Sequence, residues 1–117
     1  MSKLTTHVLD TAAGRPAAGV RIDVLGERDG TWQALGSART NADGRVDAPL
    51  LQGAQFVRGR YRLVFHVGDY FRACGHAEDS PDFLDQVPIE FGVNDPRAHY
   101  HVPLLVTPWS YSTYRGS

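Results

Sequence analysis

Apolar and polar residues alternate with a period of two along much of the chain. In the segment 20–25 every even-numbered position is apolar, and in the segment 60–67 every odd-numbered position is apolar. Successive side chains of a β-strand point to opposite faces, so each of these segments presents one apolar face and one more polar face. The pattern therefore predicts half-buried β-strands.

Turn-forming residues interrupt this alternation every eight to twelve positions, which is typical of an all-β sandwich. We expect eight strands in two packed sheets, with consecutive strands antiparallel. The clearest strand segments are 4–10, 20–27, 31–40, 60–67, 88–93 and 99–106, and a last strand runs into the C-terminal segment. The segment 68–75 lacks a period of two and is expected to form a short helix.

Composition narrows the class of protein further. A chain of 117 residues with 42% hydrophobic content fits one domain, residues 1–117. Twelve basic against thirteen acidic residues leave no basic excess, so nucleic acid is not an expected partner. The sequence has no apolar run of about 18 residues that would cross a membrane. It also begins without a secretory signal pattern, so we expect a cytoplasmic protein.

The segment HYHVPLLV, residues 99–106, carries the most informative polar residues. Its even-numbered positions form an unbroken apolar face, whereas the other face begins with His99 and His101. Two imidazoles above small apolar groups could form the floor of a ligand site. They could also hold a metal with a third ligand from His7, His66 or His76, or simply be solvated on an exposed sheet face.

Two further residues complete the set of candidate catalytic groups. His7 shares a strand face with Leu9, and Arg45 follows the turn NADG; taken alone, each is expected to be an ordinary exposed residue. The chain has no glycine-rich phosphate loop, no GxSxG elbow and no CxxC pair. An enzyme built from this set would use histidine as acid or base and arginine to hold an anionic or carbonyl-rich substrate.

The segments LTTHVLDTAAGRPAAGV, TNADGR, YRLVFHVGDYF, HYHVPLL and YSTYRGS together resemble the transthyretin-related proteins, in order and spacing, from end to end of the chain. Within that family they resemble the hydrolase branch. The resemblance implies a transthyretin-like sandwich of two four-stranded antiparallel sheets with one short helix. It also implies a homotetramer with sites in a central channel, and no cofactor or metal.

The implied reaction is hydrolysis of a cyclic amide bond in 5-hydroxyisourate, which yields 2-oxo-4-hydroxy-4-carboxy-5-ureidoimidazoline during urate degradation to allantoin. By resemblance, His7, Arg45 and His101 match the family's site residues, and the closing tetrapeptide falls on Tyr114, Arg115, Gly116 and Ser117. The expected catalytic residues are His7, Arg45, His101 and Ser117. The expected substrate-binding residues are His7, Arg45, Tyr114, His99 and Arg115.

Three alternatives remain open at this point. A transthyretin-type carrier of small aromatic ligands would use the same fold, because function depends on the site and not on the scaffold. A metal-binding sandwich would use the two histidines of HYH. An adhesion or interaction sandwich would leave His7, Arg45 and His101 without a role. For the hydrolase hypothesis, the sequence also leaves open which histidine is the general base.

Overall fold

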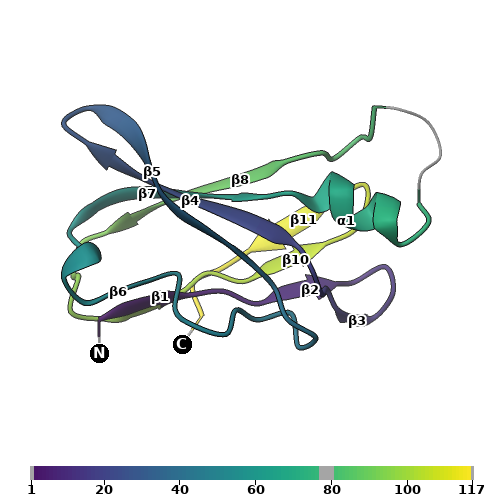
Figure 1. Ribbon diagram of the computed structural model, residues 1–117, viewed down its shortest axis with the longest axis horizontal. Helices are drawn as coiled ribbons and strands as arrows, with labels where there is room; N and C mark the ends of the chain where they lie inside the picture. The colour runs from purple at the N-terminus through teal and green to yellow at the C-terminus, as the bar shows by residue number, and fades with distance from the viewer. Residues whose placement is uncertain (1, 77–80, 117) are drawn as a thin grey trace.

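Two layers of strands face each other in the computed structural model, which describes residues 2–76 and 81–116 (Figure 1). The first layer is a four-stranded sheet with the order β5-β4-β7-β8, and every neighbouring pair in it is antiparallel. Its strands are β4 (Arg21–Arg28), β5 (Thr31–Arg39), β7 (Gly59–Phe65) and β8 (Val87–Val93). These correspond to four of the segments in which alternation predicts strands.

The second layer consists of two shorter sheets placed end to end. One has the order β6-β1-β9 and the other the order β11-β10-β2-β3. Their strands are β1 (Lys3–Thr5), β2 (Val8–Asp10), β3 (Arg15–Pro16), β6 (Leu51–Gln52), β9 (His99–His101), β10 (Leu104–Val106) and β11 (Tyr111–Thr113). A 3-10 turn, η1 (Gly53–Gln55), follows β6. The expected strands 4–10 and 99–106 are thus each divided in two.

The first and the late strands run in the same direction, which corrects the prediction of antiparallel pairing throughout. β1 pairs with β9, and β2 with β10, in parallel and in one register. Backbone bonds bridge the breaks, from Val102 N to Thr5 O (2.9 Å) and from Leu104 N to His7 O (2.9 Å). Only strands joined by a hairpin must be antiparallel. Here the chain crosses to the other layer between the two partners, so no hairpin sets their direction.

The core lies between the layers and follows the predicted alternation. The even-numbered residues of 99–106 are buried, and so are the odd-numbered residues of 61–67. The largest fully buried side chains include Tyr61, Phe65, Leu4, Ile22, Leu63 and Leu104. His99, His101 and Leu105 lie on the opposite, outer face of the second layer. The expected β-sandwich with one short helix is confirmed.

The helix α1 (Val67–Ala73) closes one end of the sandwich, where a short helix is expected (Figure 1). The Tyr70 hydroxyl donates to the buried carboxylate of Asp10 at 2.8 Å, and Asp10 also accepts from the backbone of Ala12 and Ala13. This carboxylate ties the helix to the end of β2. Among the described residues, no helix is long and apolar enough to cross a membrane.

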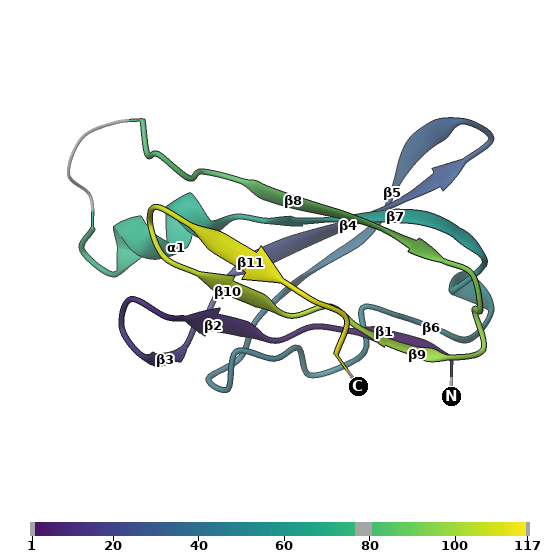
Figure 2. The ribbon, with the colours of Figure 1, turned by 180° about the vertical axis from the view of Figure 1, so that it is seen from behind.

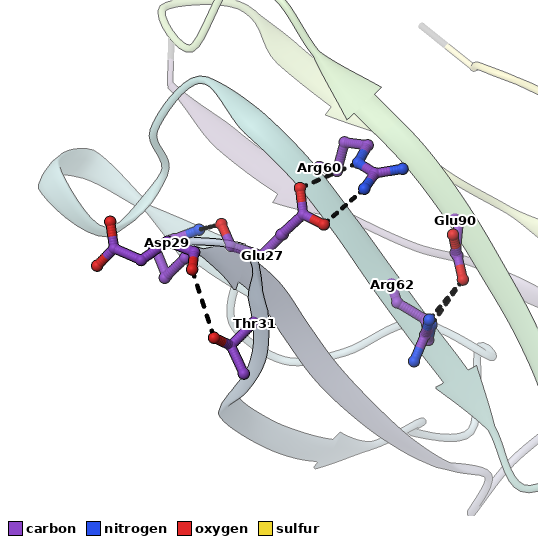
Figure 3. Close-up of polar contacts among 7 residues, drawn as sticks. Glu27, Asp29, Thr31, Arg60, Arg62 and Glu90 are labelled. Atoms are coloured by element: carbon purple, nitrogen blue, oxygen red, sulfur yellow. Dashed lines mark hydrogen bonds and ion pairs between the residues drawn. The ribbon is translucent and has the colours of Figure 1, made fainter.

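The outer face of the first layer is covered by cross-strand ion pairs (Figure 3). Arg60 pairs with Glu27 at 2.5 Å and Arg62 with Glu90 at 2.6 Å. The Arg62 guanidinium also lies 4.2 Å from the centre of the Trp32 ring. Because these charges neutralise one another in an exposed position, this face is a solvated surface.

The burial pattern of β7 makes a testable prediction. Leu63→Ala truncates a side chain that is 0% exposed, so we expect the free energy of unfolding to fall by about 2–5 kcal/mol. Val64→Ala, on the outer face of the same strand, is the matched control and should cost about 1 kcal/mol or less. Denaturant unfolding followed by circular dichroism measures both, and equal losses would contradict the assignment of faces.

Candidate active site

His99 and His101 lie on the outer face of β9 and share one hydrogen-bonding partner. That partner is Thr5 on β1, which the parallel register places directly beside His101. The Thr5 Oγ1 atom is 2.7 Å from His99 Nε2 and 2.8 Å from His101 Nδ1. A single hydroxyl therefore holds one nitrogen of each imidazole.

The turn that carries Arg45 is shaped by its own sequence and docked onto the break between β1 and β2. The Asn41 side chain accepts bonds from the backbone N–H of Asp43 (2.9 Å) and of Arg45 (3.2 Å). Gly44 has a φ of +75°, and a Cβ there would lie 2.4 Å from the Val8 carbonyl oxygen. The Val8 N–H donates to the Gly44 carbonyl at 2.8 Å. Only glycine permits this close approach, which places Arg45 beside the first strand.

His7 lies at the same break and is held by the same turn. Its Nε2 atom is 2.9 Å from the Asp43 carbonyl oxygen. A carbonyl oxygen can only accept a hydrogen bond, so His7 Nε2 carries the proton. In the neutral ring the other nitrogen, Nδ1, is then the proton acceptor.

A hollow of about 310 Å³ opens on this outer face. Its lining combines two imidazoles, two cations, hydroxyl groups and small apolar groups: Lys3, Thr5, Thr6, Arg45, Val46, Ala48, His99 and His101. Its volume is at the lower end of the range of small-molecule sites, which is about 300–1,000 Å³. His7 does not line the hollow directly.

Burial and neighbouring cations keep the two imidazoles of β9 neutral. Desolvation lowers the pKa of His101, and the charges of Arg45, His99 and His7 lower it further. Desolvation also lowers the pKa of His99, with Lys3 adding to the effect. A neutral imidazole can accept a proton, so either ring can act as a base at neutral pH.

The C-terminal segment lies against His101. β11 pairs with β10 in an antiparallel register, and an isolated bridge between His101 and Gly116 continues that register (Figure 2). The Gly116 N–H donates to the His101 carbonyl at 2.8 Å. A Cβ on Gly116 would come within 2.6 Å of the His101 ring, so the approach requires glycine.

The same register places Tyr114 opposite Pro103 and therefore on the face of His101. Its side chain is 59% exposed. Arg115 points to the other face, where its guanidinium lies 4.0 Å from the centre of the Tyr100 ring. Arg115 is thus apart from the hollow. Ser117 lies outside the described residues.

The structure separates the remaining histidines from this site. His66 is paired with Asp23 on the first layer at 2.8 Å, and His76 packs edge-on against Phe71 beyond the helix. Across residues 2–76 and 81–116, no three His, Cys, Asp or Glu side chains are grouped closely enough to hold a metal ion. The metal alternative for HYH therefore has no third ligand in this part of the chain.

The sequence pattern indicated the sheet face on which this hollow opens, but it did not indicate that Thr5 and Lys3 line the hollow. Thr5 shares the strand face of His7, and this parity was the signal available. Its importance depends on the parallel register with β9, which alternation within a strand does not specify.

A β-sandwich whose outer sheet face carries a hollow lined by imidazoles, an arginine and apolar groups is typical of domains that bind a small molecule. The chain belongs to the HIUase/Transthyretin family, whose model matches residues 4–116.

Three similar proteins illustrate the range of the family. The 5-hydroxyisourate hydrolase of Ralstonia nicotianae is 56% identical over 117 residues, with full coverage of both chains. A crystal structure of (S)-allantoin synthase superposes with a TM-score of 0.92 at 45% identity, and the match covers 98% of this chain but 43% of that longer one. Sea bream transthyretin in complex with thyroxine is 29% identical, with a TM-score of 0.86 and coverage of 97% and 94%.

The electrostatics of the hollow predict the titration of its histidines. Because the pKa values of His99 and His101 are both lowered, each ring should take up its proton at a lower pH than an ordinary histidine does. Histidine ring signals followed by NMR against pH measure this, with the urea-unfolded chain as the control that titrates near about 6.5. Midpoints at or above the unfolded value would contradict the described environment.

Proposed function

We propose that this protein hydrolyses 5-hydroxyisourate to 2-oxo-4-hydroxy-4-carboxy-5-ureidoimidazoline during urate degradation to allantoin. The observation that carries the proposal is the hollow on the outer face, in which neutral imidazoles and Arg45 converge. Identity of 56% over the full length of a hydrolase of that name supports the same substrate. The reaction is the opening of a cyclic amide by water.

In the proposed reaction an imidazole takes a proton from water while the water oxygen bonds to the ring carbonyl carbon. His101 lines the hollow and His7 lies beside it, and we assign the activation and positioning of water to this pair. The carbon–nitrogen bond of the amide then breaks, and the imidazolium returns its proton to the leaving nitrogen. No cofactor or metal takes part in these steps as proposed.

Arg45 is assigned to hold the substrate ring and stabilise the developing oxyanion. Its guanidinium is a permanent cation with several donors in a fixed plane, which suits a carbonyl-rich ring. The Asn41-shaped turn and the close packing of Gly44 support this role, since they fix where the Arg45 backbone lies. His99 is proposed as a neighbouring contact to the substrate.

The C-terminal segment is proposed to close the site through Tyr114 and Ser117, with Ser117 acting as a catalytic residue. The backbone bond between Gly116 and His101 supports the first part, because it brings the end of the chain to the catalytic face. Arg115 is assigned to substrate binding in the assembled protein. In one subunit it lies on Tyr100, so this role requires the partner subunits or a rearranged end.

The proposal further includes one domain over residues 1–117 that assembles as a homotetramer in a bacterial cytoplasm. Assembly would bring the outer faces of two subunits together around a channel, so that His7 and His101 of facing subunits could act on one substrate. Exposed aromatic side chains at the β10–β11 edge, Trp109 and Tyr111, support an interface there. The bacterial source of the similar hydrolase supports the location.

The second candidate function is a carrier of small aromatic ligands, which the likeness to a thyroxine-bound transthyretin favours. A carrier of this kind needs a mostly apolar channel. The cations Lys3 and Arg45 and two imidazoles occupy the hollow instead, which favours hydrolysis.

A direct assay separates the two functions. Freshly generated 5-hydroxyisourate, followed by ultraviolet absorbance, should decay faster with the protein than without it. His101→Asn and His7→Ala should lower kcat/KM by about 10²- to 10⁴-fold, and Arg45→Ala by about 10²- to 10³-fold. The matched controls His76→Ala and Arg60→Ala lie away from the hollow and should leave the rate unchanged. Wild-type decay equal to the uncatalysed rate would sink the hydrolase assignment.

Removal of Tyr114–Ser117 tests the role assigned to the end of the chain. A misplaced catalytic group can lower the reaction rate by about 10²-fold, so we expect turnover to fall by about 10²-fold while the tetramer persists. Activity and sedimentation measure the two effects, and a cleavable tag placed after Ser117 gives a reversible version of the same change. Full activity of the truncated protein would remove the segment from the mechanism.

A further inference from the structure

Thr5 connects His99 and His101 in a way that the assigned catalytic roles do not use. Its hydroxyl is within 2.8 Å of one nitrogen of each ring, and its side chain lines the hollow with them. A threonine hydroxyl has one proton to donate, and it can accept through its lone pairs. It could accept from both rings, but no other acceptor for its own proton is within hydrogen-bond distance among the described residues. The arrangement that uses the Thr5 proton is therefore donation to one imidazole and acceptance from the other.

This constraint leaves two arrangements of the neutral site. In the first, Thr5 donates to His101 Nδ1, so His101 carries its proton on Nε2 and has no acceptor nitrogen left for water. In the second, Thr5 donates to His99 Nε2 and accepts from His101 Nδ1–H, so His101 Nε2 is free to accept a proton. The tautomers of the two histidines are thus coupled through one oxygen atom.

The surroundings favour the second arrangement. Lys3 and Arg45 line the hollow, and both can only donate hydrogen bonds. The Arg45 charge acts on His101, which is the more buried ring, and the Lys3 charge acts on His99, which is more exposed. Water can satisfy a free N–H on His99, whereas an acceptor nitrogen on His101 is better placed near Arg45 than an N–H would be.

We propose that Thr5 is a positioning residue that sets His101 as the proton acceptor, and that His99 serves as the acceptor of the Thr5 proton. The inference rests on the proposed hydrolysis and extends it. When His101 takes a proton from water at Nε2, its Nδ1–H strengthens its bond to Thr5 because the donor is now charged. The proton stays on His101 until it passes to the leaving nitrogen, so the hydroxyl orients the ring and changes no bond of its own.

His99 thereby gains a role that needs no contact with substrate. It takes the place that a carboxylate holds behind the histidine of a serine hydrolase, with a hydroxyl in between. Lys3 lowers the pKa of His99, as Arg45 lowers that of His101, so a positive charge on His99 is disfavoured and its neutral ring can accept the Thr5 proton.

Two substitutions at one position test the proposal. Thr5→Val keeps the shape and removes the hydroxyl, and we expect kcat/KM to fall by about 10- to 100-fold, as when a metal-bound histidine loses the partner that orients it. Thr5→Ser restores the hydroxyl and should recover most of the rate. Thr5→Val should also shift the acid limb of the pH profile of kcat/KM. The charged or titratable groups that share the environment of the two rings are Arg45, His7, His99 and Lys3.

Nitrogen NMR of the histidine rings gives a readout that does not depend on turnover. In the wild-type protein and in Thr5→Ser, His101 should be protonated at Nδ1 and unprotonated at Nε2. In Thr5→Val the two tautomers of His101 should mix. A His101 ring protonated at Nε2 in the wild type would overturn the proposal, even if Thr5→Val failed to fold.

A double-substitution cycle separates coupling from general damage. His99→Phe removes the acceptor of the Thr5 proton together with the proposed substrate contact, so Thr5→Val should cost clearly less in the His99→Phe background than in the wild type. Additive losses would contradict the coupled arrangement. A wild-type protein without hydrolase activity would instead refute the proposed function, and the tautomer measurement would still stand as a separate result.

Discussion

The parallel pairing of the first strand with the late strand is the constraint on which the rest of the site depends. It joins 3–10 to 99–106 in one register that continues across the breaks in both strands. That register places Thr5 beside His101, and it lets the buried Thr6 hydroxyl donate to the Val102 carbonyl at 2.7 Å. A slip of one residue would turn His101 into the core and Tyr100 out of it. Core burial thus protects the geometry of the site.

Alternate residues of the strand segment 99–106 contribute to the core and to the candidate site. Tyr100, Val102 and Leu104 face the core, whereas His99 and His101 face outward. Because a packed interior resists displacement, the outward histidines are mounted on a rigid support. Charged and hydrogen-bonding groups on the outer face remain near solvent, where their desolvation costs less than it would in the core.

Two glycines allow loops to contact this support closely. Gly44 brings the turn of Arg45 onto the Val8 carbonyl, and Gly116 brings the end of the chain onto the His101 ring. In both places the chain forms a backbone bond to the strand pair, so position is set by main-chain geometry. Loops and terminal segments are commonly the mobile parts of a fold. Here the turn at Gly44 and the segment at Gly116 are held by backbone bonds close to the histidines.

The strand faces, the short helix and the candidate histidines followed from the sequence, because alternation and turn chemistry are local properties. Val20–Val24 and Tyr61–Val67 needed only their own neighbours to show which side was buried. The resemblance of whole segments also indicated His7, Arg45 and His101. The parallel direction of β1 and β9, the pairing of Thr5 with both imidazoles and the separation of Arg115 from the hollow were decided by the tertiary structure alone. These features join residues more than ninety positions apart or depend on which neighbours a strand acquires, and a periodic pattern within one segment contains no information on either.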